Sequence, residues 1–139
     1  MPAFNGVSHV GITVRDVDRS AAWYERVLCM QLLGEFPQFA TPGVAARVVH
    51  VRNPATGIHF ALVEHESGDD DEFSEFRVGL DHLALAIESR DELEQWIEHL
   101  DVCGVPHSGI RDMRYGGSVV VFRDPDNVQL ELFTLAIAS

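Results

Sequence analysis

The sequence predicts an α+β protein made of two tandem βαβββ modules whose strands form a cupped mixed sheet, because the chain repeats itself once. A strand-like block that contains His9 returns around His82, 73 positions later. Trp23 and Trp96 keep this offset, and each lies in a segment with helical apolar spacing. A repeated unit folds the same way twice, so each element of the first half predicts one in the second.

In the first module, an alternating apolar run over 7–14 predicts the opening strand. The apolar residues Ala21, Tyr24 and Leu28 follow with the spacing of an amphipathic helix, and Asp18 is expected to cap its N-terminus. Three further short strands are expected over 31–36, 45–51 and 58–64.

The second module has the same order of elements. Its first strand is expected over 80–87, and its helix carries Leu93 and Trp96 on the apolar face, with Ser89 as the N-cap. Matching turns at 53–57 and 124–127 precede the last strand of each half. The three further strands are expected over 105–113, 118–122 and 128–134.

These elements divide the single domain 1–139 into a first module over 1–65, a linker over 66–78 and a second module over 79–139. The linker and its approach are rich in acidic residues, including three consecutive Asp at 69–71. A run of like charges is typical of a solvated segment. We therefore expect the linker to be solvent-exposed.

Charge and composition exclude several classes of function. The formal net charge is −12, and the 10 basic residues are all Arg. Such an acidic chain repels nucleic-acid backbones, and without Lys it forms no side-chain Schiff base. No apolar run approaches the roughly 18 residues of a membrane span, and residues 1–6 lack the pattern of a secretion signal. We expect no nucleic-acid or membrane partner, and a cytoplasmic location.

Three polar side chains fall on strand faces that point away from the helices. Successive strand residues alternate between faces, so His9 is opposite the core residues Val10 and Ile12. The same parity places His82 and Glu131 opposite the apolar residues of their own strands. Burying a carboxylate or an imidazole without a partner is unfavourable, and a shared divalent metal would satisfy all three.

Two imidazoles and one carboxylate form a ligand set that leaves metal positions open for substrate, as iron, manganese and zinc enzymes require. The alternative is that each histidine is a hydrogen-bonded structural residue and that Glu131 is a surface charge. The equivalence of His9 and His82 in the repeat favours the metal site.

Two motifs resemble those of the vicinal-oxygen-chelate superfamily, the glyoxalase, bleomycin-resistance and dioxygenase group. One is the opening His9–Val14 with Trp23 and Tyr24 on the next helix, and the other is the ending Phe122–Leu132. The resemblance covers nearly the whole chain. It implies a cup around one divalent ion (Fe, Mn, Ni or Zn), a small-molecule substrate that chelates the metal through vicinal oxygens, and a homodimer.

The resemblance places the four family ligand positions at His9, Ala61, His82 and Glu131. Ala61 cannot bind a metal, whereas glyoxalase I has there a carboxylate that also takes part in proton transfer. The resemblance therefore does not imply ordinary glyoxalase I activity. His59 has the correct parity to point into the cup and is a candidate acid or base.

Further candidates lie on neighbouring segments. Tyr115 precedes two glycines and is a candidate catalytic phenol on a rim loop, although an ordinary hairpin turn fits the same residues. Thr13 shares the face of His9. His107 and Arg111 lie on the predicted strand 105–113, either in the cup as substrate-binding residues or toward solvent.

Two classes of function follow. The first is a metal-dependent enzyme, a lyase, isomerase or dioxygenase, in which the metal stabilises an anion of the substrate or activates oxygen. The second is a drug-binding module, similar to bleomycin resistance proteins, that sequesters its ligand without a metal. The presence of all three ligands favours the enzyme.

Overall fold

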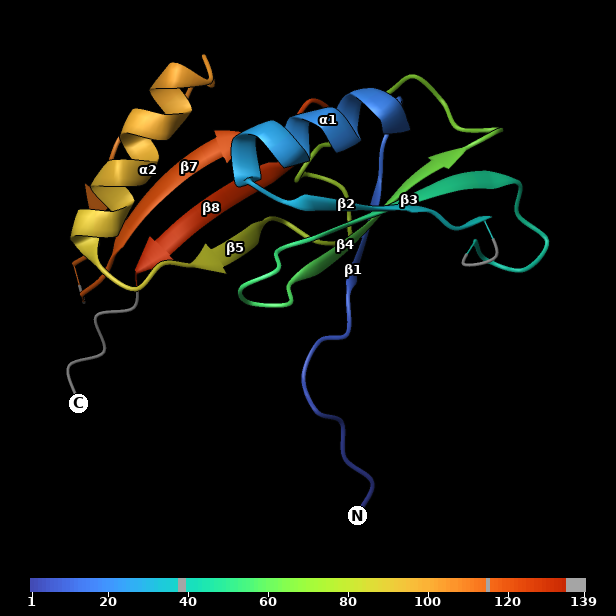
Figure 1. The fold of residues 1–139 in the computed structure, drawn as a ribbon, viewed down its shortest axis with the longest axis horizontal. Helices are drawn as coiled ribbons and strands as arrows, with labels where there is room; N and C mark the ends of the chain where they lie inside the picture. Colours follow the sequence, from blue (N-terminus) through green and yellow to red (C-terminus); the bar gives the residue numbers. More distant parts are fainter. Residues whose placement is uncertain (38–39, 115, 135–139) are drawn as a thin grey trace. The chain divides into compact units, whose positions relative to one another are not determined.

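The structure is a computed structural model that describes residues 1–37, 40–114 and 116–134 (Figure 1). It divides into two compact units, Met1–Asp71 and Glu72–Ser139. The boundary falls inside the linker expected from the sequence. Each unit is considered by itself below.

The first unit has the predicted βαβββ order. Its sheet has the strand order β1-β4-β3-β2, in which β1 runs parallel to β4 and the other neighbours are antiparallel. Helix α1 packs on one face, where the ring of Tyr24 meets that of Phe60 edge-on at a centroid distance of 5.6 Å. The elements are β1 (Val10–Thr13), α1 (Val17–Leu28), β2 (Gln31–Glu35), β3 (Ala46–Arg52) and β4 (His59–His65).

The second unit repeats this arrangement with the strand order β5-β8-β7-β6, and β5 runs parallel to β8. Leu93 and Leu100 are the buried residues of its helix. The tandem repeat predicted from the sequence is therefore confirmed. The elements are β5 (Leu83–Ala86), α2 (Arg90–Val102), β6 (Arg111–Asp112), β7 (Ser118–Arg123) and β8 (Gln129–Thr134).

The strand expected over 105–113 is largely wrong, because only Arg111–Asp112 and an isolated bridge between His107 and Phe122 pair with β7. At Ser108 only one of the two backbone bonds of the pair forms: the Ser108 amide donates to the Val121 carbonyl at 2.9 Å, but the Val121 amide donates to the Ser108 hydroxyl at 2.9 Å. Gly109 follows with φ of 70°, a left-handed conformation that does not continue a strand.

One of the two expected helix caps is wrong. Ser89 caps α2, where its side chain accepts from the Glu92 amide at 3.1 Å. Helix α1 is capped by Asp16, not by Asp18, whose carboxylate accepts two hydrogen bonds from Arg47 at 3.0 Å. The repeat contained the correct signal, because Asp16 precedes Ser89 by the same 73 positions that separate His9 from His82.

The acidic linker is exposed only in part. Asp69–Glu72 is exposed, as expected, but Phe73 and the two residues after it are half-buried. The Phe73 amide donates to the carbonyl of Asp126 at 2.8 Å, and the Asn127 side chain donates to the carbonyl of Phe73 at 3.0 Å. The expectation of a fully solvated linker is therefore wrong at residues 73–75, where the linker is bound to the turn before β8, whereas residues 76–78 are exposed.

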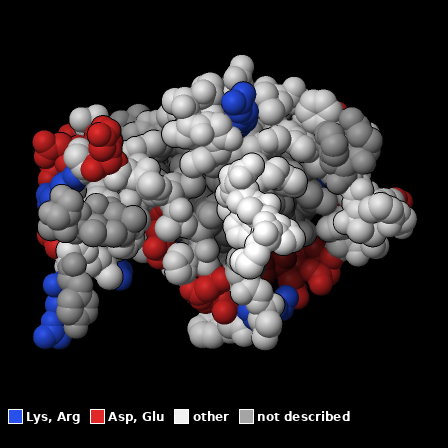
Figure 2. All heavy atoms as spheres, turned by 90° about the horizontal axis from the view of Figure 1, so that it is seen from below, with Lys and Arg blue, Asp and Glu red and all other residues white. Residues whose placement is uncertain are grey.

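Acidic side chains gather in patches on the face drawn in Figure 2, whereas the Arg side chains are scattered. This distribution agrees with the net charge of −12. Neither helix among the described residues has the length and hydrophobicity needed to span a membrane.

Candidate metal centre

The pairing of the strands determines which residues lie on each face of the second sheet. Glu131 on β8 is paired with Ala84 on β5, and its neighbours Leu130 and Leu132 are fully buried. Because paired residues share a face and successive residues alternate, Glu131 lies on the face opposite the core. His82 directly precedes β5 with the parity of Ala84, as the sequence predicts.

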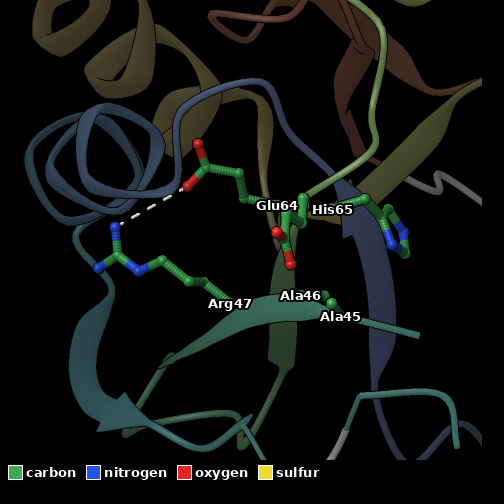
Figure 3. Close-up of a pocket in the computed structure, with 6 residues that line it drawn as sticks. Ala45, Ala46, Arg47, Glu64 and His65 are labelled. Atoms are coloured by element: carbon green, nitrogen blue, oxygen red, sulfur yellow. Dashed lines mark ion pairs between the residues drawn. The ribbon is translucent and has the colours of Figure 1, made fainter. Parts of the chain in front are cut away.

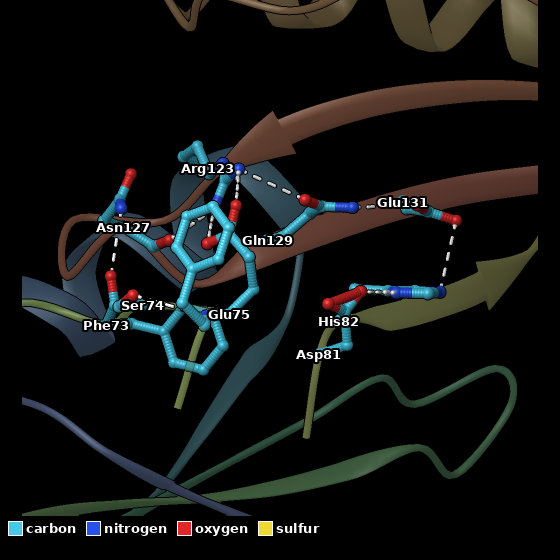
Figure 4. Close-up of polar contacts among 10 residues, drawn as sticks. Phe73, Ser74, Glu75, Asp81, His82, Arg123, Asn127, Gln129 and Glu131 are labelled. Atoms are coloured by element: carbon cyan, nitrogen blue, oxygen red, sulfur yellow. Dashed lines mark hydrogen bonds and ion pairs between the residues drawn. The ribbon is translucent and has the colours of Figure 1, made fainter. Parts of the chain in front are cut away.

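His82 and Glu131 approach each other on this face (Figure 4). The His82 Nε2 atom lies 3.7 Å from Glu131 Oε2. The other ring nitrogen, Nδ1, lies 2.8 Å from Asp81 Oδ1, and this hydrogen bond is the main reason why the pKa of His82 is raised. Since a carboxylate only accepts, Nδ1 carries the proton, and Nε2 of the neutral ring keeps its lone pair for a ligand.

The second oxygen of Glu131 belongs to a longer network. Gln129 Nε2 donates to Glu131 Oε1 at 3.0 Å, and Gln129 Oε1 accepts from Arg123 at 3.1 Å. Arg123 also donates to both oxygens of Glu75, at 3.0 and 3.2 Å. These bonds lower the pKa of Glu75 and raise that of Arg123. Sequence analysis missed this network. Arg123 on β7 is paired with Gln129 on β8, and Gln129 is two positions before Glu131, so all three lie on one face of the sheet.

In the first unit, His9 directly precedes β1, which pairs with β4 so that Val10 is opposite Phe60. His9 therefore lies next to His59, and their ring centroids are 5.9 Å apart. The Ser8 hydroxyl lies 3.1 Å from His9 Nδ1. His9 and His59 share the face opposite the core, as the sequence predicts.

His50 extends this histidine group, a contact that sequence analysis did not anticipate. Its Nδ1 lies 2.6 Å from His59 Nε2, and its ring also meets Phe36 edge-on. Burial lowers the pKa of His50, with smaller contributions from His59 and His9, and burial with the nearby His9 and Arg52 lowers the pKa of His59. Both rings therefore favour the neutral form.

Ala61 occupies the centre of this face. It pairs with Gly11 on one side and with His50 on the other. The first unit therefore has no carboxylate at the position that corresponds to Glu131. Within either unit, no three described His, Cys, Asp or Glu side chains converge closely enough to hold a metal.

Two of the predicted substrate-binding residues, Thr13 and Arg111, lie in different sheets. Thr13 is exposed and pairs with Val63 two residues beyond Ala61, so it lies on the His9 face. Arg111 pairs with Val119, which pairs with Phe133, so Arg111 lies on the Glu131 face.

His107 differs from the expectation. Its Nε2 lies 2.8 Å from the carboxylate of Asp101, on α2, and its Nδ1 accepts from the Gly109 amide at 2.9 Å. Both ring nitrogens are engaged on the helix side of the sheet, because His107 pairs with the core residue Phe122. A substrate-binding role for His107 is therefore not supported. Tyr115, the candidate phenol, lies outside the described residues.

A separate hollow lies at the ends of β3 and β4 (Figure 3). It is lined by Arg47, Glu64 and His65 among others, and Arg47 Nη1 lies 3.8 Å from Glu64 Oε2. Arg47 also binds Asp18 and Glu35. None of the predicted site residues that the structure describes lines this hollow.

Comparison with known proteins identifies similar chains. The model of the Glyoxalase/Bleomycin resistance protein/Dioxygenase superfamily matches residues 6–132. A glyoxylase/bleomycin resistance protein/dioxygenase domain from Frankia sp. EAN1pec is 34% identical, with a TM-score of 0.85 over 99% of this chain and 96% of that chain. A glyoxalase family protein from Enterococcus faecalis is 22% identical, with a TM-score of 0.76 over 94% of this chain and 98% of that one.

A more distant similarity links the chain to a fosfomycin resistance protein from Listeria monocytogenes. The identity is 18% and the TM-score 0.67, over 97% of this chain and 96% of that one, in a structure with Mn(II) and 1S,2S-dihydroxypropylphosphonic acid. No curated protein matches the chain.

Proposed function

The chain belongs to the Glyoxalase/Bleomycin resistance protein/Dioxygenase superfamily, and on this premise we propose that it is a metal-dependent enzyme whose metal ligands are His9, His82 and Glu131. The observation that carries the proposal is the pair formed by His82 and Glu131. Their Nε2 and Oε2 atoms, 3.7 Å apart, are suited to bind one ion as adjacent ligands.

The chemistry of these donors supports a divalent ion. The Asp81 carboxylate leaves the lone pair of His82 on Nε2, and Gln129 leaves Glu131 Oε2 for the ion. His9, the repeat equivalent of His82, is proposed as the third ligand. When bound, the metal would act as a Lewis acid that stabilises negative charge on substrate oxygens.

The proposed substrate is a small molecule with vicinal oxygens and an acidic group. Arg111 lies on the Glu131 face and would bind the acidic group, while Thr13 on the His9 face would donate a hydrogen bond to the substrate. The ligand named with the Listeria protein, a dihydroxypropylphosphonic acid, has both features. We propose this class of substrate, without naming one compound.

His59 is proposed as the base that moves a proton of the substrate. Its lowered pKa favours a neutral ring at pH 7, and its hydrogen bond with His50 restrains the ring beside His9. Tyr115 stays a prediction as a second catalytic group. The homodimer and the cytoplasmic location expected from the sequence also stay predictions.

Metal content tests the proposal. We expect about one iron, manganese, nickel or zinc ion per chain in protein purified without chelator, and loss of at least 90% of it in Glu131→Gln and His82→Ala variants. Glu98→Gln, an exposed change on α2, is the matched control. A protein that is free of metal and binds none when it is added would exclude the catalytic function and favour the sequestering module.

A further inference from the structure

The network that ends at Glu131 begins in the linker between the two modules (Figure 4). We infer that Gln129, held by Arg123 and Glu75, is a positioning residue that fixes the carboxylate of Glu131 for metal binding. This inference rests on the proposed function, because it assumes that Glu131 binds a metal.

The groups at the two ends of the Gln129 amide leave it one orientation. Arg123 can only donate hydrogen bonds, so it must face the amide oxygen, 3.1 Å away. The carboxylate of Glu131 can only accept, so it must face the amide nitrogen, 3.0 Å away. An amide between a guanidinium and a carboxylate is therefore satisfied at both ends and cannot flip without losing both bonds.

This orientation assigns different roles to the two oxygens of Glu131. Oε1 is held by the Gln129 amide, so Oε2 is the oxygen that faces His82 Nε2 at 3.7 Å. The side chain of Glu131 is only 14% exposed. A ligand that is fixed before the metal arrives loses less conformational freedom on binding, which strengthens the complex.

Glu75 holds the other end of the network. It accepts from both terminal nitrogens of Arg123, at 3.0 and 3.2 Å, and Arg123 also donates to the Asn127 carbonyl at 3.1 Å. Two parallel charge-assisted bonds fix a guanidinium far better than a single contact does. The linker segment that is bound to the turn before β8 therefore contributes to the metal site without touching the metal.

The test measures Co²⁺ affinity of metal-free protein by visible absorption, which also reports the ligand geometry. Gln129→Leu should weaken binding about 10- to 100-fold and change the spectrum. Gln129→Glu should do the same, because it still accepts from Arg123 but cannot donate to Glu131. Gln95→Leu, an exposed change on α2, is the matched control and should leave both unchanged.

A double substitution tests the order of the network. Glu75→Gln should weaken binding less than Gln129→Leu, and the combined variant should bind like Gln129→Leu alone, because both act through one chain of contacts. Glu72→Gln, a fully exposed change in the same linker, is the control.

The outcomes separate the inference from the proposed function. If the protein binds Co²⁺ through Glu131 but Gln129→Leu and Gln129→Glu match the wild type in affinity and spectrum, the inference is overturned and the proposed function stands. Additive losses from the Glu75 and Gln129 substitutions would overturn the linear chain. If the wild type binds no Co²⁺, both the inference and the proposed function are wrong.

Discussion

The two units share one fold but use equivalent positions differently on the face opposite the core. In the second unit, Arg123, Gln129 and Glu131 form a hydrogen-bonded row that orients a carboxylate. In the first unit, the equivalent positions hold Arg52, His59 and Ala61, and the row ends without a carboxylate.

A histidine pair replaces the carboxylate in the first unit. His50 is paired with Ala61 and bonds to His59, whereas the equivalent of His50 in the second unit is the apolar Val121, which is paired with Glu131. The same backbone thus carries a hydrogen-bonded row that ends at a carboxylate in one copy and an imidazole pair in the other. Under the proposed function, the second unit would hold two of the metal ligands, and the first would supply the third ligand, His9, and the base, His59.

The largest effects of substitution are expected in the cores of the two units. Phe60 and Leu130 are equivalent and fully buried, but Phe60 also contacts the ring of Tyr24. Phe60→Ala should lower the free energy of unfolding by about 3–5 kcal/mol and Leu130→Ala by about 2–4 kcal/mol, because each leaves a cavity. Urea unfolding measures both, and a larger loss for Leu130→Ala would contradict the comparison.

The residues that precede the two proposed ligand histidines, His9 and His82, provide the next test. Asp81 binds His82 Nδ1 with a carboxylate, whereas Ser8 approaches His9 Nδ1 with a hydroxyl. A charged acceptor orients an imidazole more strongly, so Asp81→Asn should weaken Co²⁺ binding about 10-fold or more and Ser8→Ala about 3-fold or less. Equal effects in the two variants would show that the two histidines are held alike.

Substitutions at the ends of the two helices are expected to have smaller effects. Cys29 ends α1 with φ of 53°, a strained conformation for a residue with a side chain, while Gly104 adopts φ of 70° after α2 without this penalty. Cys29 is also exposed. Cys29→Gly should raise the free energy of unfolding by about 1 kcal/mol, and Gly104→Ala should lower it by about as much. Thermal unfolding would detect opposite shifts, and shifts of the same sign would refute this explanation.

The smallest expected difference concerns acid stability. Arg47 lowers the pKa of Asp18 and Glu35 in the first unit, and Arg123 lowers the pKa of Glu75 in the second. Because the folded pKa values are depressed, the unfolded chain takes up protons first as the pH falls. The stability that these pairs contribute is present above the unfolded pKa values, which are 4.5 for Glu and 3.8 for Asp, and is lost below them.

The measurement compares unfolding temperatures of metal-free variants between pH 6 and pH 3. Arg47→Met should reduce the fall in unfolding temperature on acidification more than Arg123→Met does. The reason is that it removes the lowering of the pKa at two carboxylates instead of one. All three carboxylates are accessible to solvent, so the expected shifts are small. A steeper fall in Arg47→Met than in the wild type would contradict the sign of this prediction.

The sequence by itself determined the tandem βαβββ architecture and the strand faces of His9, His82 and Glu131. Both depend on period-2 alternation and on an offset of 73 positions, which are properties of the chain alone. The same offset would also have identified Asp16 as the cap of α1. Local hydrophobic spacing favoured Asp18, but the bond of that residue with Arg47 exists only in the folded unit.

Only the tertiary structure decided which side chains complete each site. Glu131 accepts from Gln129 on its own strand and faces His82. Arg123 on β7 links Gln129 to Glu75, which is 56 positions before Glu131 in the chain. His50 on β3 bonds to His59 on β4. His107 was expected among the substrate-binding residues, yet its pairing with the core residue Phe122 places its ring beside Asp101 of α2. Periodicity specifies the face of a strand on which a residue lies, but hydrogen-bond partners depend on register and rotamers that form only when strands pair.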